Sequence, residues 1–177
     1  LYNVQGAAID FVKDMGPSTK LLYSLQRHHG EDILTFDADM LPLPNCISTI
    51  MAYAKKFPNY IVSNFGHEMY KDGRLQPLVS GRNVVNGFAP NAVKGVYNKY
   101  VMAQGCGTIY YPSKINEQLY QDGEIFNVPD YMKYNDDLWF YLDEQRLGIG
   151  DVVIMREHIR LADLGKDIGL HMGVNVD

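Results

Sequence analysis

The chain has 177 residues, of which 46% are hydrophobic and 21% charged, the proportions of a globular protein forming one domain over residues 1–177. Its 16 Lys and Arg against 21 Asp and Glu give a net charge of -5, which argues against a nucleic-acid surface. No uncharged run reaches the roughly 18 apolar residues of a membrane span, and Cys46 and Cys106 lack the spacing of a zinc site or a disulfide framework.

The first part of the chain alternates between short apolar runs and helical patterns. The predicted elements are, in order, a strand at 7–12, a helix at 17–28, a strand at 32–36, a helix at 45–57 and a strand at 60–63. In the second helix, Ile47, Ile50, Met51 and Ala54 are expected on one buried face. This alternation predicts an α/β fold with a mostly parallel sheet flanked by helices.

The second part of the chain has weaker patterns. Residues 64–104 predict loops and irregular strands, and residues 105–112 predict a glycine-lined turn that runs into a short strand. Leu138, Tyr141 and Leu142 recur at helical spacing, so we expect a helix whose first turn holds two acids. Residues 151–155 predict the last strand.

Asp37 and Asp39 follow the predicted strand 32–36 directly. Ligands of α/β proteins bind outside the carboxyl ends of the strands, and carboxylate oxygens are the ligands that hard cations prefer. The pair is therefore a candidate metal site. A solvated loop or a capping pair is the alternative.

Asp136 and Asp137 form a second acidic pair, at the start of a predicted helix. Adjacent carboxylates repel and raise the pKa of one of them, which favours either helix capping or acid/base chemistry. Trp139 and nearby tyrosines offer aromatic faces on which a sugar ring can stack, with core packing as the alternative for Trp139. Lys20 follows the Gly16-Pro17 turn and is the nearest cation that could approach a phosphate at the crevice, with a solvated helix lysine as the alternative.

Four segments together resemble bacterial family-2-like glycosyltransferases in order and spacing. They are KDMGPSTKL at 13–21, DILTFDADM at 32–40, GCGTIYYP at 105–112 and NDDLWF at 135–140. The resemblance covers almost the whole chain. It implies a GT-A fold, a nucleotide-sugar donor and a divalent metal, Mn²⁺ or Mg²⁺.

The resemblance also implies a role for each matching residue. Asp37 and Asp39 would be metal ligands. Asp137 would be the general base, and Asp136 would orient it or bind the acceptor. The nucleotide-sugar would contact Lys20, Asp37, Gly105 and Gly107, and the acceptor would contact Tyr110 and Trp139. The implied acceptor is a carbohydrate or lipid-linked hydroxyl in bacterial surface-polysaccharide assembly. The implied location is the cytoplasm, and peripheral attachment at the inner face of the membrane is left open.

The chain also departs from this family. We expect it to lack the amino-terminal strand and helix that complete the nucleotide pocket, and Met40 stands where a third acid often occurs. Two alternatives stay open. One is a haloacid-dehalogenase-like phosphohydrolase with Asp37 as nucleophile, and the other is a non-catalytic carbohydrate-binding relative.

Overall fold

The computed structural model describes residues 10–37, 40–68, 95–97, 101–105, 108–155 and 162–163. Its helices are α1 (Thr19–His28), α2 (Cys46–Lys56), α4 (Ser113–Asp122) and α5 (Asp136–Leu147), with short 3₁₀ helices at Glu124–Phe126 and Asp130–Met132. Its strands are β1 (Ile33–Phe36), β2 (Met40–Leu41), β3 (Ile61–Ser63), β4 (Gly66–Glu68), β5 (Gly95–Tyr97), β6 (Val101–Ala103), β7 (Thr108–Tyr111), β8 (Val152–Ile154) and β9 (Ala162–Asp163).

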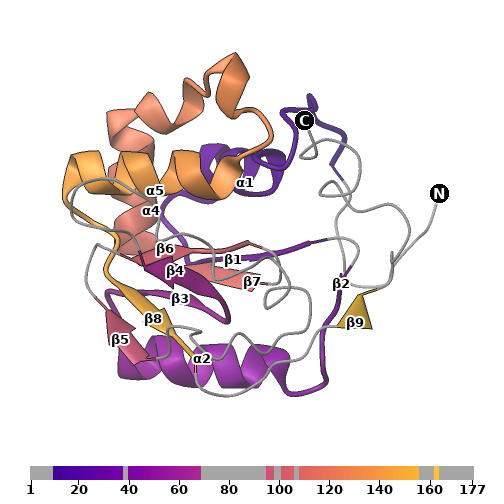
Figure 1. Ribbon diagram of the computed structural model, residues 1–177, viewed down its shortest axis with the longest axis vertical. Coiled ribbons are helices and arrows are strands. Elements are labelled where there is room, and N and C mark those ends of the chain that lie inside the picture. Colours follow the sequence, from indigo (N-terminus) through magenta and orange to yellow (C-terminus); the bar gives the residue numbers. More distant parts are fainter. Residues whose placement is uncertain are drawn as a thin grey trace.

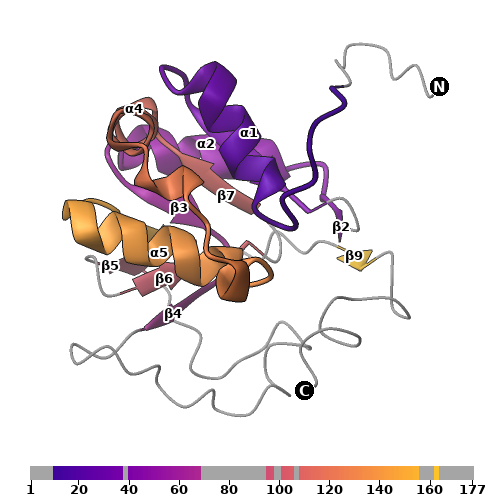
Figure 2. The ribbon, with the colours of Figure 1, turned by 90° about the horizontal axis from the view of Figure 1, so that it is seen from above.

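The main sheet has five strands in the order β1-β7-β3-β8-β5. Helices α1, α4 and α5 cover one face of it and α2 covers the other (Figure 1), and Figure 2 shows the first three from above. Two smaller two-stranded pairings, β2 with β9 and β4 with β6, complete the strands that the structure describes. The α/β class predicted from the sequence is confirmed. Within the described ranges, no helix combines the length and the apolarity that crossing a bilayer requires.

The prediction of a mostly parallel sheet needs correction. Only β3 and β8 pair in parallel within the main sheet described here, whereas the pairs β1–β7, β7–β3 and β8–β5 are antiparallel. The physical reason is the insertion of β7 between β1 and β3. Because β7 runs against both neighbours and β8 pairs in parallel with β3, the strands β1, β3 and β8 still point the same way. Their carboxyl ends therefore lie at one edge, and Asp37 follows β1 at that edge.

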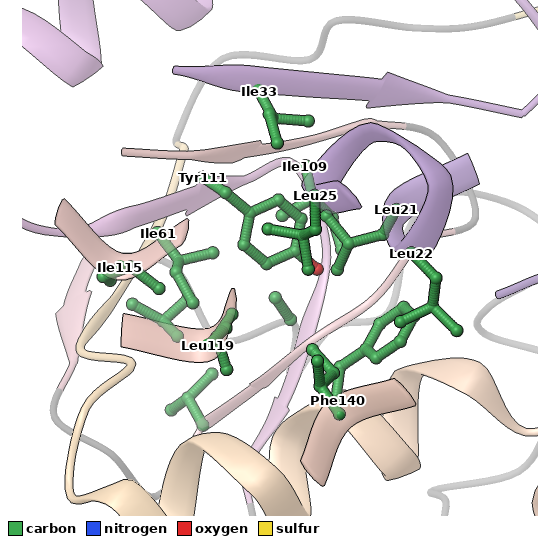
Figure 3. Close-up of a cluster of buried hydrophobic side chains, with 14 of the residues drawn as sticks. Leu21, Leu22, Leu25, Ile33, Ile61, Ile109, Tyr111, Ile115, Leu119 and Phe140 are labelled. Carbon is green, nitrogen blue, oxygen red and sulfur yellow. The ribbon is translucent and has the colours of Figure 1, made fainter. Parts of the chain in front are cut away.

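Two apolar clusters hold the sheet between its helices. On one face, three leucines of α1 meet Ile109 and Tyr111 of β7 and Phe140 of α5 (Figure 3); the leucines are Leu21, Leu22 and Leu25, all fully buried. On the other face, Cys46, Ile50 and Ala54 of α2 pack against a set that includes Tyr110 of β7. Consecutive residues of β7 thus serve opposite faces, as the period of two in a strand dictates.

Several predicted elements are found, and others differ. The structure contains both helices predicted in the first part of the chain, α1 ending at His28 and α2 following Asn45. It also contains the strands predicted within 32–36, 60–63 and 151–155, which are β1, β3 and β8. Most of the predicted strand at 7–12 lies outside the described residues. Helix α4 was missed, because only Ile115 and Leu119 mark its apolar face and its third buried residue is Asn116.

The apolar face predicted for α2 is only half right. Ile50 and Ala54 are buried with Cys46, but Ile47 and Met51 are 57% and 44% exposed. A helix that rests on a flat sheet buries one row of side chains, and the next row, about 100° further round, remains in water.

Candidate functional site: a lysine among three carboxylates

Four structural elements bring the site together at the edge where β1 ends. Lys20 stands in the first turn of α1, and Asp37 directly follows β1. Asp136 and Asp137 form the first turn of α5, and Gly105 lies two residues beyond β6. Helix α1 packs on the core through its leucines, and α5 packs on it through Phe140. The polar residues in the first turn of each helix therefore remain at the edge of the sheet.

Lys20 joins the two acidic segments. Its Nζ lies 2.6 Å from Oδ1 of Asp37 and 3.4 Å from Oδ2 of Asp136. Burial acts to lower the pKa of Lys20, but Asp136 and Asp37 together raise it above its ordinary value, so the ammonium stays charged. Residues nearly a hundred positions apart in the sequence are thus held by one cation. We name Lys20, Asp37, Asp136, Asp137 and Gly105 the carboxylate cluster.

Asp137 has a strongly perturbed carboxyl group. Desolvation by burial raises its pKa to about 7, and the charge of Asp136 adds to this. The backbone N–H of Gly105, which donates to Oδ1 of Asp137 over 2.8 Å, and the charge of Lys20 act in the opposite direction. A carboxyl group that titrates near neutral pH can both accept and release a proton under physiological conditions.

Asp136 is 8% exposed and lies beside Asp137. Among the described residues its buried Oδ2 has no hydrogen-bond partner, and its compensation is the ammonium of Lys20. Both acids also stand at the amino terminus of α5, where the helix dipole favours negative charge. The dipole and Lys20 together explain how two neighbouring carboxyl groups are kept inside the protein.

Gly105 is required by the close packing of the cluster. A Cβ at this position would lie 2.8 Å from Nζ of Lys20 and 2.9 Å from Oδ1 of Asp137. Both distances are shorter than van der Waals contact. A side chain here would therefore push the two charged groups apart.

The sequence did not single out two buried groups that lie behind the cluster. Tyr111 is fully buried, and its pKa is raised by burial and then by Glu144, Asp137 and Asp136. The pKa of Glu144 is raised well above its ordinary value by burial and then by Asp143 and Asp137. The seven-residue spacing from Asp137 to Glu144, two helical turns, was the signal available in the sequence.

The two residues predicted to contact the acceptor lie elsewhere. Tyr110 is 4% exposed and packs with Cys46 on the α2 side of the sheet, near Asp32 at the opposite end of β1 from Asp37. Trp139 packs against the core on the other side and donates its indole N–H to the carbonyl of Ile125 over 2.8 Å. These placements favour the core-packing alternative for Trp139, and they bury Tyr110 away from the carboxylate cluster.

The predicted metal site is only partly within the described structure. Asp39 and Gly107 lie outside the described residues. Among those that are described, no three His, Cys, Asp or Glu side chains are arranged to hold a metal ion. Within the described part of the site, the ammonium of Lys20 supplies the positive charge between Asp37 and Asp136.

Comparison of the chain with protein-family models, with curated proteins and with solved structures found no match. The geometry of the carboxylate cluster and the sequence resemblance are therefore the basis for a proposal about function.

Proposed function

We propose that this protein is a glycosyltransferase that moves a sugar from a nucleotide-sugar donor to an acceptor hydroxyl, with inversion at the anomeric carbon. The observation that carries the proposal is the meeting of Lys20, Asp37 and the Asp136–Asp137 pair at one sheet edge, with the pKa of Asp137 raised to about 7. The order and spacing of the four glycosyltransferase-like segments support it. The acceptor we propose is a carbohydrate or lipid-linked hydroxyl, and the site of action is the cytoplasm.

Asp137 is the general base of the proposed reaction. Its ionised carboxylate takes the proton of the acceptor hydroxyl while the hydroxyl oxygen forms a bond to the anomeric carbon. The bond from that carbon to the diphosphate oxygen breaks on the opposite face. General-base help of this kind contributes roughly 10²–10⁴-fold in rate. Gly105 orients Asp137 through its N–H, and Asp136 lies next to the base.

Lys20 is the proposed contact for the diphosphate of the donor. It is the cation that the described structure places inside the carboxylate cluster, and an anionic ligand can draw it away from Asp37. A divalent cation, Mn²⁺ or Mg²⁺, stays part of the proposal through Asp37 and Asp39. When bound it would neutralise charge on the departing diphosphate.

The test is release of nucleoside diphosphate from UDP-, GDP- and dTDP-sugars in the presence of Mn²⁺. We expect release with one donor class, its loss in Asp39→Ala, and a decrease of at least about 100-fold in Asp137→Asn. The rate should rise with pH through about 7, because the base must be ionised. The exposed Asp130→Asn is the matched control and should behave as the wild type. No release with any donor, or full activity of Asp137→Asn, would refute the proposal.

A phosphohydrolase is the second candidate, and the 2.6 Å contact between Lys20 and Asp37 fits it as well. In that reaction the carboxylate of Asp37 would attack phosphorus and displace the alcohol of the phosphomonoester, while Lys20 holds the phosphoryl oxygens. Water would then hydrolyse the aspartyl-phosphate, which releases phosphate and restores Asp37. Hydrolysis of p-nitrophenyl phosphate with Mg²⁺, abolished by Asp37→Asn and without turnover of nucleotide-sugars, would select this candidate.

A further inference from the structure

The outer side of α2 combines exposed apolar side chains with lysines. Ile47 and Met51 are 57% and 44% exposed, one helical turn apart, and Lys55 follows at the same spacing with Lys56 beside it. Leu43, just before the helix, is 40% exposed. We name Leu43, Ile47, Met51, Lys55 and Lys56 the α2 outer face.

The charge of this region is opposite to that of the whole chain. The chain carries a net charge of -5 and 21 acidic residues, yet residues 40–67 contain no Asp or Glu. Their only charged side chains are Lys55 and Lys56. A stretch free of acids around a cationic helix is complementary to an anionic surface.

The arrangement of the face also restricts the class of partner. The apolar row lies on the convex exposed side of a helix, about 100° round from the row of Cys46, Ile50 and Ala54 that is packed on the sheet. A deformable apolar phase can accept such a convex row. Two lysines at one end are too few to bind a nucleic-acid backbone strongly, since each phosphate contact adds only a small increment.

Aromatic side chains at the end of α2 fit the same partner. Phe57 and Tyr60 meet edge to face, with ring centroids 5.8 Å apart, and the ammonium of Lys56 lies 5.3 Å from the centroid of Phe57. Partly buried aromatic rings with polar tips or cationic neighbours are preferred where an apolar phase meets water.

We propose that the α2 outer face binds the surface of an anionic phospholipid bilayer, with Ile47 and Met51 in the interface and Lys55 and Lys56 at the headgroups. This binding is peripheral, as for an amphipathic helix that lies in the interface plane. It is independent of the chemistry at the carboxylate cluster, whose helices α1 and α5 cover the face of the sheet opposite α2 (Figure 1).

The test is co-sedimentation of the full chain with vesicles of phosphatidylglycerol and, separately, of phosphatidylcholine, at low salt. We expect clear preference for phosphatidylglycerol and loss of binding as salt rises. Ile47→Ser with Met51→Ser should lower the partition coefficient at least about tenfold. Lys55→Gln with Lys56→Gln should lower it about 30-fold on anionic vesicles.

The matched control is Leu142→Ser on α5, a residue 46% exposed on the other side of the sheet. It should bind vesicles as the wild type does, and all variants should keep the wild-type thermal unfolding because the changed side chains are exposed. Absence of binding to phosphatidylglycerol, or equal binding to both lipids, would overturn the proposal. So would wild-type binding by the serine variant, or a mass in sedimentation showing that the face joins two copies of the chain.

Discussion

Gly105 is the residue at which one added carbon changes the candidate site most directly. Its N–H holds Asp137, and its missing side chain leaves room for Lys20 and Asp137 to approach each other. Its backbone is not in the left-handed region, so alanine adds a steric effect without conformational strain.

We predict that Gly105→Ala lowers turnover of the donor by about 10–100-fold, the range expected when catalytic groups are displaced by about 1 Å. The free energy of unfolding should change by less than about 1 kcal/mol, because the flexible end of Lys20 can move aside. Steady-state kinetics and urea unfolding measure the two effects. Unchanged turnover across the pH range would show that the close contact has no part in the reaction.

At the scale of single residues, the sequence predicted the types and positions of the cluster acids but not their contacts. The spacing of Asp37 and of Asp136–Asp137 at element ends was visible, whereas the ammonium that joins them depends on the path of α1 over the sheet. The sequence predicted Tyr110 as the acceptor contact, whereas Tyr111 is the tyrosine that lies beside the acids. A glycine-rich turn before a strand does not determine which face of the sheet each side chain of the strand occupies.

At the scale of secondary-structure elements, the turn before α1 packs closely against the segment before α5 at Gly16. Gly16 has φ +69°, and a Cβ there would lie 2.9 Å from the backbone carbonyl oxygen of Lys133. Its own carbonyl accepts the N–H of Thr19, which begins the helix that carries Lys20. The turn thus sets the position of both helices whose first residues form the cluster.

Gly16→Ala should therefore destabilise the fold by about 1–3 kcal/mol, through a strained left-handed alanine and a clash with backbone that cannot move freely. Gly30→Ala is the matched control, because a Cβ at Gly30 has no atom within 4 Å. It should stay within about 0.5 kcal/mol of the wild type. Denaturant unfolding followed by circular dichroism compares them; equal stability of the two variants would contradict this role of the Gly16 turn.

The order of strands was less predictable than the strands themselves. Short apolar runs identified β1, β3 and β8, and their common direction followed from the helices between them. The insertion of β7 could not be read from the sequence, since a four-residue run carries no information about its partners. For α2, periodicity identified the helix but not how far its apolar side would be covered.

Across the whole molecule, burial of acids makes stability depend on pH near neutrality. Burial raises the pKa of Asp137 to about 7 and that of Glu144 well above its ordinary value. In the unfolded chain both groups ionise near pH 4. Above that pH, and up to their raised pKa values, the folded state holds protons that the unfolded state has released, so stability falls as the pH rises.

We predict that the free energy of unfolding decreases between pH 5 and 7, by up to about 1.4 kcal/mol per pH unit for each proton involved. The lowered pKa of partly buried His67 acts in the opposite sense below its ordinary value of 6.5 and offsets part of the decrease there. Glu144→Gln should reduce the slope, while the exposed Glu117→Gln should leave it unchanged. Thermal unfolding at several pH values measures this, and a stability that rises over the window would contradict it.

The two tyrosines of β7 show how much depends on one register. Tyr111 faces the acids of α5 and Tyr110 faces Cys46, and each is paired across the sheet to β1, with Tyr110 also paired to β3. A slip of β7 by a single residue would exchange the two phenols between the faces. Hydrogen bonding of β7 to both β1 and β3 therefore keeps Tyr111 next to the carboxyl groups of α5 and Tyr110 beneath α2.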